Sequence, residues 1–124
     1  MILAAAATAG LTASSASAQA SFCSQEGANY ICEYGFTERP LPGGGVEKFV
    51  IGTDGAVWTN YTSDNKWHTL DGIATSQVFI ESEYIGNDFH TTIIVLGGDG
   101  KPWARERPYI GGSWTPWARA PRPH

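Results

Sequence analysis

The 124-residue sequence has little of what most catalytic and metal-binding proteins require. It holds two cysteines and three histidines, and His68, His90 and His124 are scattered without the spacing of metal ligands. It contains no zinc-protease motif, no phosphate-binding glycine loop and no nucleophile elbow. A histidine oriented by an acid, as at His68 and Asp71, and a carboxylate pair for glycoside hydrolysis remain open alternatives. The favoured prediction is a non-catalytic protein without a metal or cofactor.

Long hydrophobic runs and basic clusters are also absent. No segment after residue 20 has the roughly 20 consecutive apolar residues that a membrane-spanning helix needs, which predicts no membrane insertion. The net charge is −4, and neither half of the chain has an excess of lysine and arginine. This charge distribution argues against nucleic acid as a partner.

Residues 1–20 are uncharged and rich in Ala, Ser and Thr, and they end in Ala18-Gln19-Ala20. The small-x-small ending predicts a secretory signal peptide cleaved before Ser21, although the usual basic start is missing and a disordered tail is the alternative. The remaining residues, 21–124, are expected to form a single domain. For a secreted protein, Cys23 and Cys32 are expected to form a disulfide; a metal pair would need two further soft ligands.

Helix signals are nearly absent after residue 20, whereas 15 glycines and 7 prolines separate short runs rich in β-branched and aromatic residues. Such runs predict strands, and the sequences GTDG and GGDG predict tight turns between them. The fold class is therefore all-β. The expected strands are Asn29–Phe36, Glu47–Ile51, Ala56–Tyr61, Lys66–Leu70, Gln77–Tyr84, Phe89–Leu96, Lys101–Arg107 and Ser113–Ala118.

The eight expected strands form two similar sets of four. Gly52, Asp54, Gly55 and Trp58 recur 45 residues later as Gly97, Asp99, Gly100 and Trp103. Trp67 pairs with Trp114 at an offset of 47, which implies a second hairpin loop two residues longer. We therefore expect repeat 1 over about 28–72 and repeat 2 over about 73–118. A repeat of about 45 residues with four strands has the size of a β-propeller blade.

The segments FVIGTDGAVWTNYTSDNKWHTL and IIVLGGDGKPWARERPYIGGSWTPWARA resemble the repeat of PLL-type bacterial propeller lectins. The layout of two blades per chain is similar to that of small fucose-binding lectins, in which three chains close a six-bladed ring. The resemblance covers roughly Val46–Leu70 and Ile93–Ala118. It implies two four-stranded propeller-like blades, glycan binding and a homo-oligomer, most plausibly a trimer. The Arg/Glu/Trp sugar site of the fucose lectins does not map cleanly, because Thr59-Asn60-Tyr61 stands where repeat 2 has Ala104-Arg105-Glu106.

Aromatic side chains beside polar ones are the candidate binding residues, because sugar rings stack on flat aromatic surfaces while polar groups bind their hydroxyls. The repeated Trp58 and Trp103 are more typical of packing between blades, Asp54 and Asp99 of turn caps, and Arg105-Glu106-Arg107 of a solvated strand face. The candidate ligand-binding residues are Trp58, Tyr61, Trp67, Trp103, Arg105, Glu106 and Trp114.

Together these patterns predict a secreted, non-catalytic, lectin-like protein that binds glycans and assembles into a propeller ring. The alternative is a small secreted protein-interaction or inhibitor module that uses an exposed loop near 105–114. The position of the tryptophans discriminates between them: exposed tryptophans beside polar groups favour glycan binding, whereas buried tryptophans and a protruding loop favour the interaction module.

Overall fold

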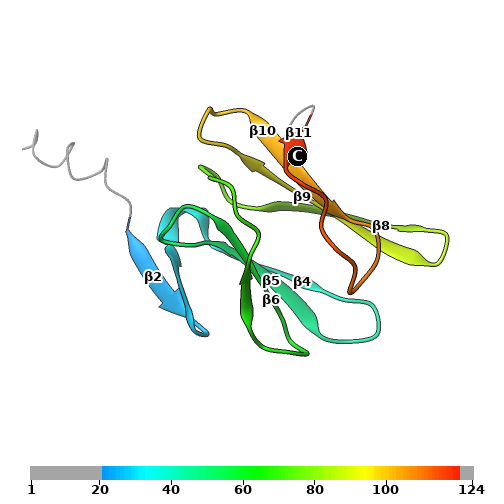
Figure 1. Ribbon diagram of the computed structural model, residues 1–124. Coiled ribbons are helices and arrows are strands. Elements are labelled where there is room, and N and C mark those ends of the chain that lie inside the picture. Colours follow the sequence, from blue (N-terminus) through cyan, green and yellow to red (C-terminus); the bar gives the residue numbers. More distant parts are fainter. Residues whose placement is uncertain (1–20, 121–124) are drawn as a thin grey trace, which may run out of the picture.

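The computed structural model describes residues 21–120, so the predicted signal segment lies outside the described residues. The described chain is all-β, as predicted, and comprises a hairpin and two four-stranded antiparallel sheets (Figure 1). The hairpin pairs β2 (Phe22–Gln25) with β3 (Ala28–Ile31), and a 3-10 turn (Cys32–Tyr34) follows it. Sheet 1 has the order β4 (Phe36–Pro40), β5 (Val46–Ile51), β6 (Val57–Tyr61), β7 (Trp67–Thr69). Sheet 2 has the order β8 (Phe79–Ile85), β9 (Asp88–Leu96), β10 (Pro102–Arg107), β11 (Ala118–Arg119).

The two Asp-Gly turns form as the sequence predicts. Asp54 caps the β5–β6 turn, because its Oδ1 accepts a 3.0 Å hydrogen bond from the Ala56 N–H, and Gly55 takes a φ of 85° that favours glycine. Asp99 does the same in the β9–β10 turn, where it accepts from the Lys101 N–H at 3.0 Å and is followed by Gly100 at 77°. The two turns therefore give their flanking strands equivalent pairing registers: Ile51 pairs with Val57, and Leu96 pairs with Pro102.

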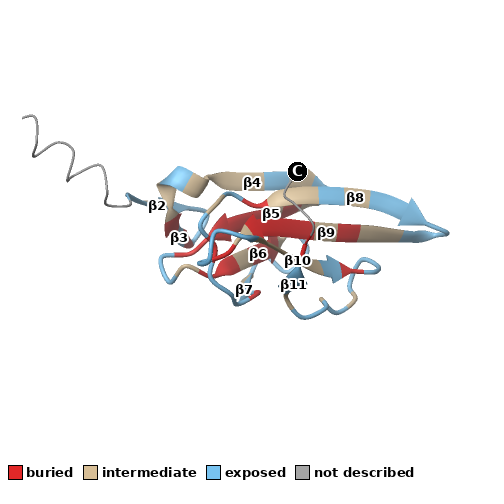
Figure 2. Ribbon diagram, turned by 90° about the horizontal axis from the view of Figure 1, so that it is seen from above, coloured by how far each residue is buried: buried red, intermediate tan, exposed pale blue. Residues whose placement is uncertain are grey.

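The main hydrophobic core lies between the two sheets. Successive side chains of a strand point to opposite faces of its sheet, so every second residue of sheet 1 faces every second residue of sheet 2. Figure 2 shows the buried residues concentrated in β5, β6 and β9. The core residues are Phe49, Ile51, Val57, Leu70, Ala74, Val78, Ile93 and Val95.

A buried ion pair also joins the two sheets. Arg107 of β10 is fully buried and makes two hydrogen bonds of 2.9 Å to the carboxylate of Glu47 on β5. Thr59 donates a third hydrogen bond to this carboxylate at 3.1 Å, and the Arg107 guanidinium lies 4.8 Å from the centre of the Trp114 ring. The expectation of a solvated strand face at 105–107 is therefore wrong for Arg107, because a carboxylate on the other sheet compensates its charge.

The β2–β3 hairpin covers the outer face of sheet 1, the face that points away from sheet 2. Ala28 and Tyr30 are buried against Val50, and Tyr30 forms an isolated bridge with Gly52. The predicted disulfide between Cys23 and Cys32 is present and ties the start of this hairpin to its end.

Six of the eight predicted strands agree with the structure within two residues, and two do not. The expected strand Asn29–Phe36 is interrupted by the turn at Cys32–Tyr34, and the first strand of sheet 1 is β4 instead. The expected strand Ser113–Ala118 is a loop up to Trp117, and only Ala118 and Arg119 pair with β10. The strands that stand in their place, β4 and β11, are sheet edges, where pairing on one side only gives a weak sequence signal. Pro40 is tolerated at the end of the edge strand β4, and Pro116 lies in the loop before β11.

We expect replacement of both Cys23 and Cys32 by alanine to lower the free energy of unfolding by about 2–3 kcal/mol, because the disulfide closes a short loop. Denaturant unfolding monitored by tryptophan fluorescence measures this change. Since the hairpin covers only sheet 1, the amide signals of sheet 2 should stay in place while those around Val50 shift. A uniform loss of structure in both sheets would contradict this expectation.

Candidate functional site

Two hollows with the same construction lie at the turn ends of the two sheets. The first pocket has a volume of 270 Å³ and lies between the hairpin and sheet 1. The second pocket has a volume of 410 Å³ and lies between sheet 1 and sheet 2. The first is lined by Gly27, Ala28, Asn29, Val50, Gly52, Thr53, Asp54, Trp58 and Trp67. The second is lined by Val57, Gly72, Ile73, Val95, Gly97, Gly98, Asp99, Trp103 and Trp117.

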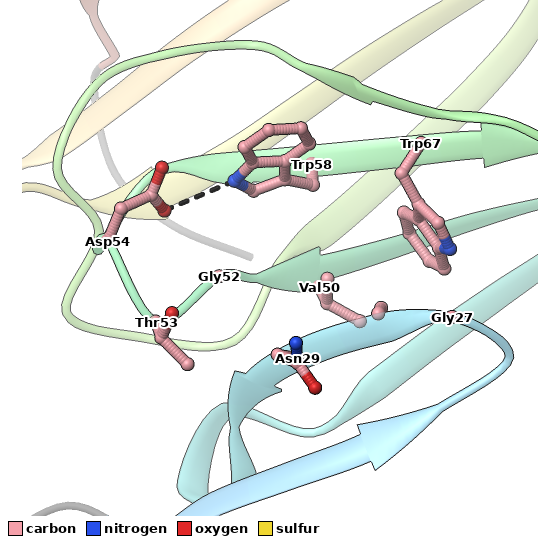
Figure 3. Close-up of a pocket in the computed structure, with 9 residues that line it drawn as sticks. Gly27, Asn29, Val50, Gly52, Thr53, Asp54, Trp58 and Trp67 are labelled. Atoms are coloured by element: carbon pink, nitrogen blue, oxygen red, sulfur yellow. Dashed lines mark hydrogen bonds between the residues drawn. The ribbon is translucent and has the colours of Figure 1, made fainter.

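A hydrogen bond between the turn aspartate and a tryptophan is repeated in both pockets. Oδ1 of Asp54 accepts from Trp58 Nε1 at 3.1 Å (Figure 3), and Oδ1 of Asp99 accepts from Trp103 Nε1 at the same distance. The bond satisfies the one polar atom of each indole and fixes the orientation of its ring. The apolar ring face is then left to line the pocket.

A glycine makes room for each of these indoles. A Cβ atom at Gly52 would lie 2.7 Å from Trp58 Nε1, and one at Gly97 would lie 2.6 Å from Trp103 Cδ1. Any larger residue would push the ring out of place. The repeated glycines, which the sequence suggested only as turn residues, therefore determine the shape of both pockets.

The second tryptophan of each pocket comes from the edge strand or the residue before it. Trp67 Nε1 donates to the Glu26 carbonyl at 3.0 Å, and Trp117 Nε1 donates to the Leu70 carbonyl at 2.7 Å. The backbone confirms this equivalence, because Leu70 N donates to Val57 O just as Ala120 N donates to Pro102 O. Trp117, 50 residues after Trp67, is thus its counterpart, and the predicted match of Trp67 with Trp114 is wrong.

The opposite wall of each pocket also repeats. Gly27 and Gly72, 45 residues apart, have φ angles of 84° and 79°, and each follows a residue with positive φ, Glu26 and Asp71. The β2–β3 hairpin therefore lines the first pocket with Gly27, and the connection between the two sheets lines the second pocket with the equivalent Gly72. The Glu-Gly and Asp-Gly pairs at the known offset of 45 are the signal in the sequence that could have revealed this third, partial copy.

The structure separates the other predicted ligand residues from the pockets. Tyr61 and Trp114 lie at the buried ion pair, where Tyr61 accepts a hydrogen bond from Arg107 and Trp114 packs edge-on against Phe49. Arg105 donates to the Leu70 and Thr115 carbonyls, each at 2.6 Å. Its guanidinium also packs over the Trp117 ring, 5.8 Å from the ring centre. Glu106 is exposed beside His90. Of the seven predicted residues, Trp58, Trp67 and Trp103 line the pockets, and Trp117 was missed.

The electrostatics of the second pocket centre on Asp99. Hydrogen bonds from the Lys101 N–H and then from the Trp103 indole hold the pKa of this carboxyl below its usual range. Arg119 adds a weaker attraction, since one of its nitrogens lies 3.4 Å from Oδ2 while its guanidinium lies 4.8 Å from the centre of the Trp103 ring. Asp99 thus stays an anionic hydrogen-bond acceptor even in mildly acidic solution.

Each pocket offers two indole rings and one carboxylate, a set suited to holding a ligand by stacking and hydrogen bonding. Among the described lining residues, Thr53 and Asp54 of the first pocket and Asp99 of the second carry a hydroxyl or carboxylate group. Within residues 21–120, no group of three histidine, cysteine or acidic side chains is placed to hold a metal ion. In the same range, no helix is long and apolar enough to cross a bilayer.

Comparison of the sequence with protein-family models and with curated proteins finds no match. The geometry of the two pockets is therefore the basis for assigning a function.

Proposed function

We propose that this chain is a secreted, non-catalytic carbohydrate-binding protein whose binding sites are the two tryptophan-walled pockets. The observation that carries the proposal is the repetition. The same glycine, aspartate and two tryptophans line both pockets, and in each pocket a hydrogen bond to the aspartate fixes one of the indoles. Core packing alone would not require two matched open hollows.

The chemistry of a pyranose ring fits this arrangement. Its apolar C–H face stacks on an indole, and its hydroxyl groups donate to a carboxylate or exchange hydrogen bonds with hydroxyl and amide groups. In the first pocket the exposed Thr53 lies beside Asp54, whose Oδ1 is already used by Trp58 (Figure 3). The exposed Asn29 lies across from them on the hairpin, where its Oδ1 accepts from Ser24 Oγ. Oδ2 of Asp54 has no hydrogen-bond partner within residues 21–120 and can accept from a sugar hydroxyl.

The proposal includes association of the chain with copies of itself, with a trimeric ring as the preferred arrangement. Its support is the outer face of sheet 2, where the half-buried Phe79, Leu96 and Ala104 share a side that alternation directs away from sheet 1. Several weak sites on one assembly would bind a glycan-covered surface by avidity. Light scattering should give three times the mass of one chain; a monomer would refute this part alone.

The experiment that tests glycan binding uses the five tryptophan indole N–H signals in a ¹H–¹⁵N spectrum of the purified protein. A glycan array first identifies a binding glycan, which is then titrated into the labelled protein. We expect Trp58, Trp67, Trp103 and Trp117 to shift and Trp114 to stay, because Trp114 lines neither pocket. Trp67→Ala and Trp117→Ala should each weaken binding at their own pocket at least tenfold. An array without binding, or shifts confined to Trp114, would refute the proposal.

A second candidate function has its own observation. At the opposite end of the sheets, four large apolar side chains are 42–60% exposed, which is unusual for side chains of this size. They are Tyr84, Ile85, Tyr109 and Ile110, and three of them line a hollow of 330 Å³ together with Pro42 and Phe89. This patch favours the protein-interaction module. Capture of a protein partner that Ile110→Asp abolishes and Trp67→Ala leaves intact would support it over glycan binding.

A further inference from the structure

The two pockets share one frame but differ at the positions around it. Thr53 in the first pocket corresponds to Gly98 in the second, 45 residues later, so the second pocket lacks a hydroxyl at this position. Across the pocket, the residue that follows the positive-φ glycine is Ala28 in the first pocket and Ile73 in the second. Ile73 is 59% exposed, and its Cγ2 lies 3.5 Å from the position of a Cβ atom at Gly98. The second pocket has therefore exchanged a polar rim for an apolar one.

The carboxylates of the two pockets also differ in what they leave open. Oδ2 of Asp54 has no partner in the described part of the chain, whereas Oδ2 of Asp99 lies 3.4 Å from an Arg119 nitrogen. Thr69 occupies the position in sheet 1 that corresponds to Arg119, since Trp58 pairs with Thr69 as Trp103 pairs with Arg119. Asp99 is consequently the less available acceptor for a sugar hydroxyl.

The second pocket differs from the first in what borders it. It lies against a whole sheet, including the fully buried Val57, whereas the first pocket is bordered by the two-stranded hairpin. Its accessible apolar wall is the exposed side chain of Ile73. The second pocket is also larger, at 410 Å³ against 270 Å³. Among the described residues that line it, Asp99 is the one with a charged side chain.

We propose that the two pockets have different specificities: the second selects pyranosides that carry an apolar substituent, such as the methyl group of a 2-acetamido sugar, whereas the first binds the unsubstituted ring through its hydroxyl groups. This inference rests on the proposed carbohydrate-binding function. The ring stacks on an indole in both pockets, and in the second the substituent packs against the exposed side chain of Ile73. In the first pocket Thr53 and Asn29 offer hydrogen bonds to hydroxyl groups, and they provide no apolar surface for the methyl group.

The expected preference follows from the area that the substituent buries. One buried methyl or methylene group contributes about 0.8 kcal/mol, which corresponds to about a fourfold difference in dissociation constant. The second pocket should therefore bind an acetamido sugar about fourfold more tightly than the parent sugar. At the first pocket the dissociation constants of the two sugars should be nearly equal.

The test uses glucose, galactose and mannose, each paired with its 2-acetamido-2-deoxy derivative, and the indole signals as separate reports of the two pockets. Trp103 and Trp117 should shift at about fourfold lower concentrations of the acetamido sugar within a pair that binds. Trp58 and Trp67 should respond to both members at similar concentrations. Equal ratios at both pockets would overturn the inference while leaving carbohydrate binding intact. The absence of any shift with all six sugars would overturn the inference, whereas carbohydrate binding itself is refuted by an array without binding.

The variant Ile73→Ala combined with Gly98→Thr gives the second pocket the residues of the first at both positions. It is expected to fold, because Ile73 is exposed and Gly98 has an ordinary φ with only Ile73 near its added Cβ. The acetamido preference at Trp103 and Trp117 should fall to a ratio near one. The matched control Ile85→Ala removes an equally exposed isoleucine at the β8–β9 tip and should keep the preference. A preference that survives the double variant would overturn the assignment to these residues.

Discussion

Replacement of Glu47 by glutamine is expected to lower the free energy of unfolding by about 3–5 kcal/mol, because it leaves the fully buried Arg107 charge without a counter-charge. Glutamine keeps the size of the side chain, and it can keep the hydrogen bond from Thr59. The loss is therefore electrostatic and not a packing defect. A domain of this size has a total stability of only about 5–15 kcal/mol, so the substitution removes a large part of it.

The position of this ion pair explains why its loss should affect the whole domain. Arg107 lies on β10 and Glu47 on β5, so the pair connects the two sheets at the end of the core away from the Asp-Gly turns. The guanidinium is also placed over the rings of Tyr61, at 5.3 Å, and Trp114, at 4.8 Å. Burial and the nearby Glu47 charge raise the pKa of the Tyr61 hydroxyl, so it remains neutral beside the pair.

Denaturant unfolding with a double-mutant cycle measures the coupling between the two charges. Glu47→Leu and Arg107→Met should each be strongly destabilising, whereas the two combined should recover much of the loss, since no buried charge is left unpaired. Glu106→Gln is the matched control. Glu106 precedes Arg107 on the same strand, but it is 53% exposed, and its pair with His90 is expected to contribute less than about 1 kcal/mol. Equal effects at Glu47 and Glu106 would contradict the argument.

The sequence predicted the features of this fold that are encoded locally. The Asp-Gly turns are written in adjacent residues, and both form with the expected aspartate cap. The four inner strands of the two sheets were found because alternation and β-branched residues mark strands that are paired on both sides. The disulfide could be predicted because only two cysteines were available to form it.

What the sequence did not reveal depends on contacts between distant residues. Trp114 and Trp117 are three residues apart in a loop, and only the pairing of β10 with β11 shows that Trp117 is the counterpart of Trp67. Arg107 was expected in solvent because its partner Glu47 lies 60 residues away. The hairpin was not recognised as a partial repeat, because its sequence shares little more than an acidic residue followed by glycine with the connection after β7. The similarity is clear only in the positive φ angles of Gly27 and Gly72.

Gly97→Ala is expected to abolish binding at the second pocket and to leave the first intact. The added Cβ would lie 2.6 Å from Trp103 Cδ1 and 2.8 Å from its Nε1, distances that no van der Waals contact allows. The indole must therefore move, and its 3.1 Å hydrogen bond to Asp99 breaks. We expect affinity at this pocket to fall more than tenfold and the free energy of unfolding to fall by about 1–3 kcal/mol, as for other overpacked sites.

The repeat provides the reciprocal experiment. At Gly52, a Cβ would meet Trp58 Nε1 at 2.7 Å, so Gly52→Ala should displace Trp58 and abolish binding at the first pocket alone. Gly98→Ala is the control for both, because it adds the same methyl group next to Gly97 where only Ile73 is near, at 3.5 Å. In the ¹H–¹⁵N spectrum, Gly97→Ala should move the Trp103 indole signal and not that of Trp58, and Gly52→Ala should do the reverse. An unmoved Trp103 signal in Gly97→Ala would mean that the glycine does not position the indole, and the common design inferred for the two pockets would fail with it.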